Sequence, residues 1–125
     1  MKEIEGIILK LETKDLNGYV FPKDCKIEYP DKIPITLGYE FNKPGRVIGN
    51  AKIIRNDDTL TIQGEIMDDA IDTLVEEEIY THLGFFANKV KKKDNNVNEM
   101  SIRSVALLTE NEGALPYCKI IKKEK

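Results

Sequence analysis

Histidine is nearly absent from this chain of 125 residues, in which His82 is the only one. The two cysteines, Cys25 and Cys118, stand far apart and form no CxxC pair. Zinc sites use several His or Cys ligands at close spacing, so the sequence predicts no zinc centre, and no other cofactor pattern is present. Two isolated cysteines in a chain expected in the cytoplasm are predicted to be free thiols.

Long apolar runs and excess positive charge are also lacking. A membrane-spanning helix needs about 20 apolar residues, and no segment reaches that length. Charged side chains interrupt residues 1–11, unlike the continuous apolar stretch of a signal peptide, so we expect the cytoplasm and no membrane contact. The net charge of −3 and the pI near 5.3 argue against direct nucleic-acid binding, which usually needs a basic surface.

The composition that is present suits one folded domain over residues 1–125. Hydrophobic residues make up 41% and charged residues 33%, which is ordinary for a globular protein. Alternating apolar and polar residues predict strands at residues 3–12, 33–41, 46–55, 59–67, 79–91, 99–109 and 116–122. The polar link 56–58 predicts a hairpin, and Leu60, Ile62 and Ile66 share its buried face.

One helix is predicted at about residues 69–78, with Asp68 or Asp69 as its cap. Ile71, Leu74 and Val75 form its apolar stripe. The predicted fold class is therefore mainly β (α+β): a small antiparallel barrel or curved sheet with one packed helix.

Four segments, taken in order, carry short motifs of one known family. They are residues 15–23, 48–66, 83–86 (Leu-Gly-Phe-Phe) and 105–114. Together they resemble the prohead (capsid maturation) proteases of tailed phages, which share their fold with the herpesvirus assemblins. In the first segment Tyr19 stands where the family usually has Arg. The resemblance covers most of the chain and implies a prohead-protease-like fold.

The catalytic residues of that family are missing. Its nucleophile is the Ser directly before the Leu-Gly-Phe motif, and this chain has His82 there. Its base is a His in the loop after the second strand, and residues 37–44 contain none. A serine nucleophile needs a positioned base, so the resemblance implies a protein without protease activity. The alternative is a diverged maturation serine protease that pairs His82 with Ser101 or Ser104.

A non-catalytic relative of a capsid protease is expected to be a structural virion protein. The first hypothesis is an auxiliary or decoration protein that stabilises the capsid by binding the major capsid protein. Other virion proteins and further copies of the chain, in a homo-oligomer on the capsid, are additional candidate partners. It would occupy the virion after assembly in the host cytoplasm. An assembly-stage binding module that is absent from the mature virion is a further alternative.

The expected contact surfaces are residues 13–32, 42–45 and 92–98. Aromatic side chains near loops and lysines near a hairpin tip supply the candidate interaction residues: Tyr19, Phe21, Phe41, Phe86, Lys91, Lys92 and Lys93. The lysines could contact phosphate or an acidic partner, although solvation is the default. The acidic residues 68–78 match no EF-hand, and a solvated, capped helix explains them without a metal.

Overall fold

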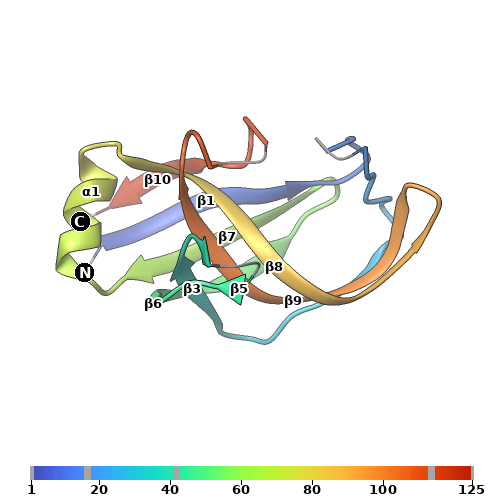
Figure 1. Cartoon of the computed structure of the whole chain (residues 1–125), viewed down its shortest axis with the longest axis horizontal. Helices are drawn as coiled ribbons and strands as arrows, with labels where there is room; N and C mark the ends of the chain where they lie inside the picture. Colours follow the sequence, from blue (N-terminus) through green and yellow to red (C-terminus); the bar gives the residue numbers. More distant parts are fainter. Residues whose placement is uncertain (1, 16–17, 41–42, 113–114, 125) are drawn as a thin grey trace.

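The structure is a computed structural model, and it describes residues 2–15, 18–40, 43–112 and 115–124. Within these ranges the chain is mainly β with one short helix (Figure 1), which confirms the expected class. The elements are β1 (Lys2–Lys10), β2 (Lys26–Glu28), β3 (Ile33–Leu37), β4 (Tyr39–Glu40), β5 (Lys43–Pro44), β6 (Val47–Arg55), β7 (Thr59–Ile66), α1 (Asp69–Glu76), β8 (Tyr80–Lys93), β9 (Asn96–Thr109) and β10 (Ile120–Glu124).

The β6–β7 hairpin forms the regular antiparallel part of the main sheet. Its register runs from Gly49 opposite Ile66 to Arg55 opposite Leu60. Leu60, Ile62 and Ile66 are all fully buried, whereas Gln63 on the other face is exposed. The predicted two-residue alternation is therefore confirmed. β1 pairs antiparallel with the free side of β7, and β10 pairs antiparallel with β1.

Strand β9 makes the sheet mixed, which corrects the expectation of a purely antiparallel one. It pairs antiparallel with β8 along one edge. Along its other edge it runs parallel to β2, with Ile27 opposite Met100, and parallel to β3, with Ile35 opposite Val105. Parallel neighbours require a long connection, and here it contains the β6–β7 hairpin, α1 and β8. The strand order is β10-β1-β7-β6-β3-β9-β2, with β8 on β9.

The open sheet curves until β8 approaches the residues that precede β10. One isolated bridge joins His82 to Lys119, and the Leu83 N–H donates to the Cys118 carbonyl at 2.8 Å. Gly6 of β1 lies at this seam, where an added Cβ would be 2.2 Å from Leu83 Cδ1 and 2.9 Å from the Lys119 carbonyl oxygen. A glycine is therefore required for β1 to pass so close to β8. The described residues form a strongly curved, open mixed sheet and not a barrel closed by continuous ladders.

Helix α1 lies at one end of the sheet and packs against β7 and β8 (Figure 1). Its predicted cap is confirmed: the Asp68 carboxylate accepts from the N–H groups of Ala70 and Ile71, both at 3.1 Å. The hydrogen bond from Arg46, at 2.7 Å, and the two backbone bonds hold the pKa of Asp68 below its usual range. Ile71 and Val75 are buried, as the apolar stripe predicted.

Three predicted element boundaries are wrong for local reasons. The predicted helix extends to residue 78, but α1 ends at Glu76 because the backbone of Glu78 turns to φ 60°. The predicted strand 33–41 breaks at Gly38, whose φ of 62° turns the chain into β4 and the separate β4–β5 pair. The last strand begins at Ile120 rather than at residue 116, because a turn precedes it in which the Cys118 N–H donates to the Leu115 carbonyl.

Both cysteines are unpaired, as predicted, and both are buried, each with only 2% of its surface exposed. Burial raises the pKa of the Cys118 thiol to about 12. Burial also raises the pKa of Cys25, although the positive charge of Arg55 opposes that effect. Both groups are therefore neutral parts of the interior at neutral pH.

Candidate functional site

His82 lies at the start of β8, in the seam with the residues that precede β10. It is opposite Leu108 of β9 on one side and forms the isolated bridge to Lys119 on the other. Its Nδ1 atom is 2.8 Å from the Thr81 hydroxyl oxygen. The side chain is half-buried.

The structure does not bring His82 to either candidate serine. Ser104 lies opposite Phe86 and Ser101 opposite Asn88, farther along the β8–β9 pair. Ser104 is four positions before Leu108 on β9, about 13 Å at the usual rise of a strand. A general base must lie within about 3 Å of the proton that it abstracts, so these residues form no nucleophile–base pair.

The tip of the β8–β9 hairpin projects at the end of the molecule opposite α1 (Figure 1). Lys89, Lys91, Lys92 and Lys93 are all exposed there. Lys89, with φ 52°, lies in a bulge between Asn88 and Lys91, where the pairing with β9 shifts. A bulge twists an edge strand and re-aims its side chains, so the lysines spread around the tip.

Tyr19 and Lys92, both candidate interaction residues, contact each other. The Lys92 Nζ atom donates to the Tyr19 hydroxyl at 2.9 Å and lies 4.3 Å from the centre of its ring. The backbone continues this contact, because the Val20 N–H donates to the Asn95 carbonyl and the Val97 N–H to the Val20 carbonyl. These contacts join residues 18–20 to the tip of the β8–β9 hairpin, residues 89–97, and we call the joined surface the hairpin end. The rest of the predicted stretch 13–32 extends beyond it, because Lys26–Glu28 pairs with Glu99–Ser101 of β9.

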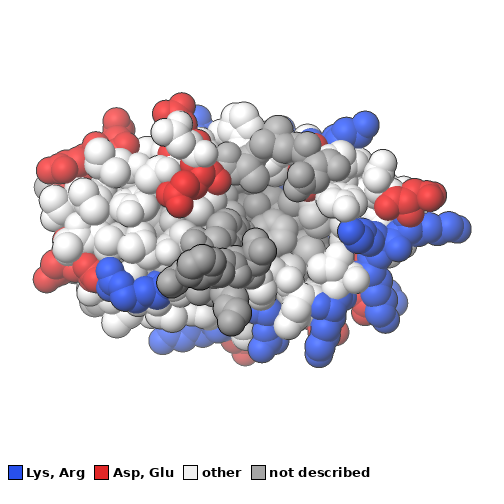
Figure 2. All heavy atoms as spheres, in the orientation of Figure 1, with Lys and Arg blue, Asp and Glu red and all other residues white. Residues whose placement is uncertain are grey.

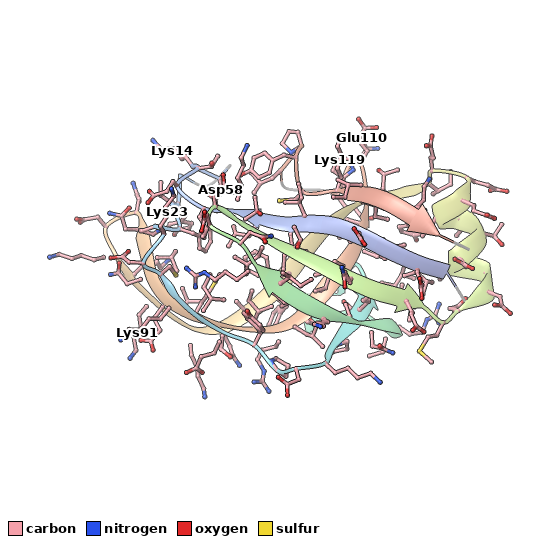
Figure 3. All side chains as sticks on the ribbon, turned by 180° about the vertical axis from the view of Figure 1, so that it is seen from behind. Lys14, Lys23, Asp58, Lys91, Glu110 and Lys119 are labelled. Atoms are coloured by element: carbon pink, nitrogen blue, oxygen red, sulfur yellow. The ribbon has the colours of Figure 1, made fainter. Side chains whose placement is uncertain are left out.

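Residues 89–97 of the hairpin end carry four lysines and one acidic residue, Asp94. Lys14, Lys23 and Lys91 lie at this end of the molecule, together with Asp58 (Figure 3). Lys91 forms an exposed ion pair with Glu99 at 3.2 Å, which contributes at most about 1 kcal/mol to stability. Figure 2 shows lysine and arginine side chains gathered on this part of the visible face, with fewer acidic side chains among them. This surface suits an acidic partner.

The candidate aromatic residues have different positions. Phe21 is only 8% exposed and packs edge-to-face on Phe85, with ring centres 6.2 Å apart. The expectation that Phe21 is an interaction residue is therefore wrong. Phe21 belongs to the core, and its burial there anchors the loop that carries Tyr19. Phe86 is half-buried on β8. Phe41 lies outside the described residues.

Two features of the surface have no counterpart in the sequence interpretation. The Arg55 guanidinium donates to the Cys25 carbonyl at 2.9 Å and to the Lys23 carbonyl at 2.8 Å, and so fixes the turn beside the hairpin end. A cleft of about 450 Å³ lies over the outer face of β1, β7 and β6. Side chains alternate between the two faces of these strands, so the sequence indicates the polar residues that line the cleft. The loop that borders the cleft is positioned only by the tertiary fold.

The described part of the chain contains neither a metal-ligand cluster nor a membrane-spanning helix. No cluster of three or more His, Cys, Asp or Glu side chains there could hold a metal ion. Helix α1, the one helix described, lacks the length and apolar character needed to cross a membrane. Comparisons with protein-family models, curated proteins and solved structures found no match to this chain.

Proposed function

We propose that the chain is a non-catalytic auxiliary capsid protein of a tailed phage, with a prohead-protease-like fold. It binds the major capsid protein and stabilises contacts between neighbouring capsid subunits. The observation that carries this proposal is His82, which occupies the position of the nucleophilic Ser in the resembled family and is the chain's only histidine. Fold alone does not determine function, so the capsid assignment rests on the family resemblance.

The separation of His82 from Ser101 and Ser104 along the β8–β9 pair supports a binding role over the diverged protease. The mainly β fold with one helix between the central hairpin and the long β8–β9 hairpin is compatible with the resemblance.

The hairpin end is the surface that we assign to the capsid contact. Tyr19 and Lys92 hold the loop and the hairpin tip together, so the surface is organised before binding. Exposed lysines would meet acidic groups of the capsid subunits. Each contact is weak in isolation, but many copies on a symmetric lattice gain avidity from one another.

Mass spectrometry of purified particles of the phage that encodes the chain tests this function. The expected result is a full-length chain at a fixed ratio to the major capsid protein. Its absence from particles, with recovery from unassembled material, would contradict the proposal and favour an assembly-stage module. Cleavage of a capsid or scaffold protein that is lost in the variant His82→Ala would instead establish a protease.

A further inference from the structure

A groove interrupts the sheet along one edge of β9. On this edge β9 runs parallel to β2 as far as Ser101 and parallel to β3 from Val105 onward. Residues 29–34 connect the two paired segments, whereas only residues 102–104 separate them on β9. The connection is therefore too long to continue the ladder. It leaves a groove of about 480 Å³, which is lined by Ile27, Glu28, Tyr29, Pro30, Ser101 and Arg103.

Ser101 supplies this groove with a polar group that the fold leaves unused. Only 5% of the residue is exposed, yet it lines the groove. Its hydroxyl has no hydrogen-bond partner among the described residues. A hydroxyl can donate one hydrogen bond and accept two, so in this position it bonds to water or to a polar ligand. Ser101 is therefore a polar contact that is already in place for a small ligand.

Two opposite charges flank this hydroxyl without pairing. Arg103 is two positions beyond Ser101 and Glu28 is in register with it, so all three side chains share one face of the sheet. Arg103 and Glu28 are both exposed, and neither forms an ion pair with a described residue. Glu99, the preceding acidic residue on this face of β9, is paired with Lys91. The groove thus offers both a guanidinium and a carboxylate to a ligand.

These two charges define the charge of a suitable ligand. A guanidinium binds a carboxylate through two parallel hydrogen bonds, and a carboxylate accepts hydrogen bonds from an ammonium group. A simple anion would be repelled by Glu28, and a simple cation by Arg103. A zwitterion satisfies both. In a free α-amino acid the ammonium and carboxylate groups stand on one carbon atom, whereas the two ends of a peptide are apart.

The rest of the lining favours an apolar side chain on the ligand. Ile27 and Tyr29 are half-buried and Pro30 is exposed, and together they form the apolar part of the groove. Binding sites for small molecules combine such apolar surface with a few polar groups that orient the ligand. The groove has both parts.

We propose that this groove binds a free α-amino acid with an apolar side chain. Arg103 receives the carboxylate, with the Ser101 hydroxyl donating to it, and Glu28 receives the ammonium group. The charged side chains are exposed to water, so the expected dissociation constant is in the millimolar range. The groove uses none of the residues of the hairpin end, and the inference does not depend on the capsid assignment.

Nuclear magnetic resonance titration of the isotopically labelled full-length chain tests this site with three matched probes. They are L-leucine, its α-hydroxy analogue, which lacks the ammonium group, and L-leucinamide, which lacks the carboxylate. L-leucine is expected to shift the amide signals of residues 27–29 and 101–103 in a saturable manner. Each analogue loses one charged contact and should bind about tenfold more weakly. Equal binding of all three probes, or no saturable shift with L-leucine, would overturn the proposal.

Neutral substitutions of the two charged residues assign the contacts. Arg103→Gln is expected to weaken L-leucine binding by about tenfold or more, because the carboxylate loses its bidentate partner. Glu28→Gln is expected to weaken it as well, because the ammonium group loses a charged acceptor. Both positions are exposed, so these variants retain the fold. Tighter binding to Glu28→Gln would overturn the proposal, because the groove would then recognise a plain carboxylate.

The matched controls are Lys52→Gln and Glu3→Gln, which make the same changes in net charge at exposed positions of the cleft over the outer face of β1, β7 and β6. Both are expected to bind L-leucine like the unmodified chain. Weakening in these controls to the same extent would mean that net charge, and not contact in the groove, is responsible. That result would overturn the site.

Discussion

Ser104 lies on β9 with only 2% of its surface exposed, and its hydroxyl oxygen has no hydrogen-bond partner among the described residues. An unsatisfied buried hydroxyl costs about 1–3 kcal/mol. Ser104→Ala is therefore expected to leave the free energy of unfolding unchanged or to raise it by about 1 kcal/mol, measured by urea denaturation.

Thr36 on the neighbouring strand β3 provides the control for this prediction. Its side chain is equally buried, but its hydroxyl donates to the Gly38 carbonyl at 3.3 Å. Thr36→Val preserves the shape and removes this bond, so a loss of about 1 kcal/mol is expected. If Ser104→Ala lowered the free energy of unfolding as much as Thr36→Val does, the Ser104 hydroxyl would have a stabilising hydrogen-bond partner, and the prediction would be wrong.

The Cys118 thiol makes the free energy of unfolding depend on pH in the alkaline range. Burial raises its pKa from 9.0 to about 12 in the folded chain. Between these values the unfolded chain loses the proton while the folded chain keeps it, so stability falls as the pH rises above 9. A single titrating group changes the free energy of unfolding by at most about 1.4 kcal/mol per pH unit.

Urea denaturation of the unmodified chain and of Cys118→Ala at pH 8 and pH 10 isolates this contribution. The variant is less stable at pH 8 because a buried group is lost, but the difference between the two proteins narrows at pH 10. A difference that is equal at both pH values would show that Cys118 titrates normally in the folded chain.

The sequence predicted some site residues better than others. Lysines at a polar hairpin tip are exposed in any antiparallel pairing, so Lys91, Lys92 and Lys93 were predictable. Tyr19 was a candidate, but its contact with Lys92 depends on how the loop lies beside the hairpin, which no local pattern encodes. Phe21 was misassigned because an aromatic residue after a turn can anchor the loop in the core as readily as face solvent.

At the scale of elements, the C-terminus of α1 contains a strained residue. The Ile79 N–H donates to the Leu74 carbonyl and the Glu78 N–H to the Val75 carbonyl, which is the Schellman pattern that ends many helices. The left-handed position of this pattern usually holds Gly, but here Glu78 adopts it with φ 60°. A residue with a Cβ pays about 1 kcal/mol in that conformation.

Glu78→Gly is therefore expected to raise the free energy of unfolding by about 1 kcal/mol, measured by urea denaturation. The neighbouring Glu77 has φ −78°, which any residue adopts, so Glu77→Gly is the control and should not stabilise the chain. Equal effects of the two substitutions would show that charge removal, and not backbone strain, is responsible.

The elements themselves were predictable where local pattern and tertiary burial agree. The β6–β7 hairpin and α1 follow from alternation, a polar link and an aspartate cap. The three-residue strand β2 is too short to show alternation, and its parallel pairing with β9 joins residues far apart in the sequence. Local sequence patterns therefore could not predict that the sheet contains parallel as well as antiparallel pairs.

At the scale of the whole molecule, the tip of the β8–β9 hairpin and helix α1 lie at opposite ends (Figure 1). The hairpin end presents lysines around the contact between Tyr19 and Lys92. The proposed attachment to a capsid would use this end alone, and a lattice that holds neighbours at fixed spacing would turn weak contacts into avidity.

Co-sedimentation of the purified chain with particles assembled in its absence tests the proposed capsid function most directly. The account predicts saturable binding in a density gradient, at a fixed ratio of chain to major capsid protein. The variant Lys89→Glu/Lys93→Glu should bind more weakly, because it reverses charges at the hairpin end. A chain that remains at the top of the gradient at every concentration, while the particles sediment alone, would contradict the account.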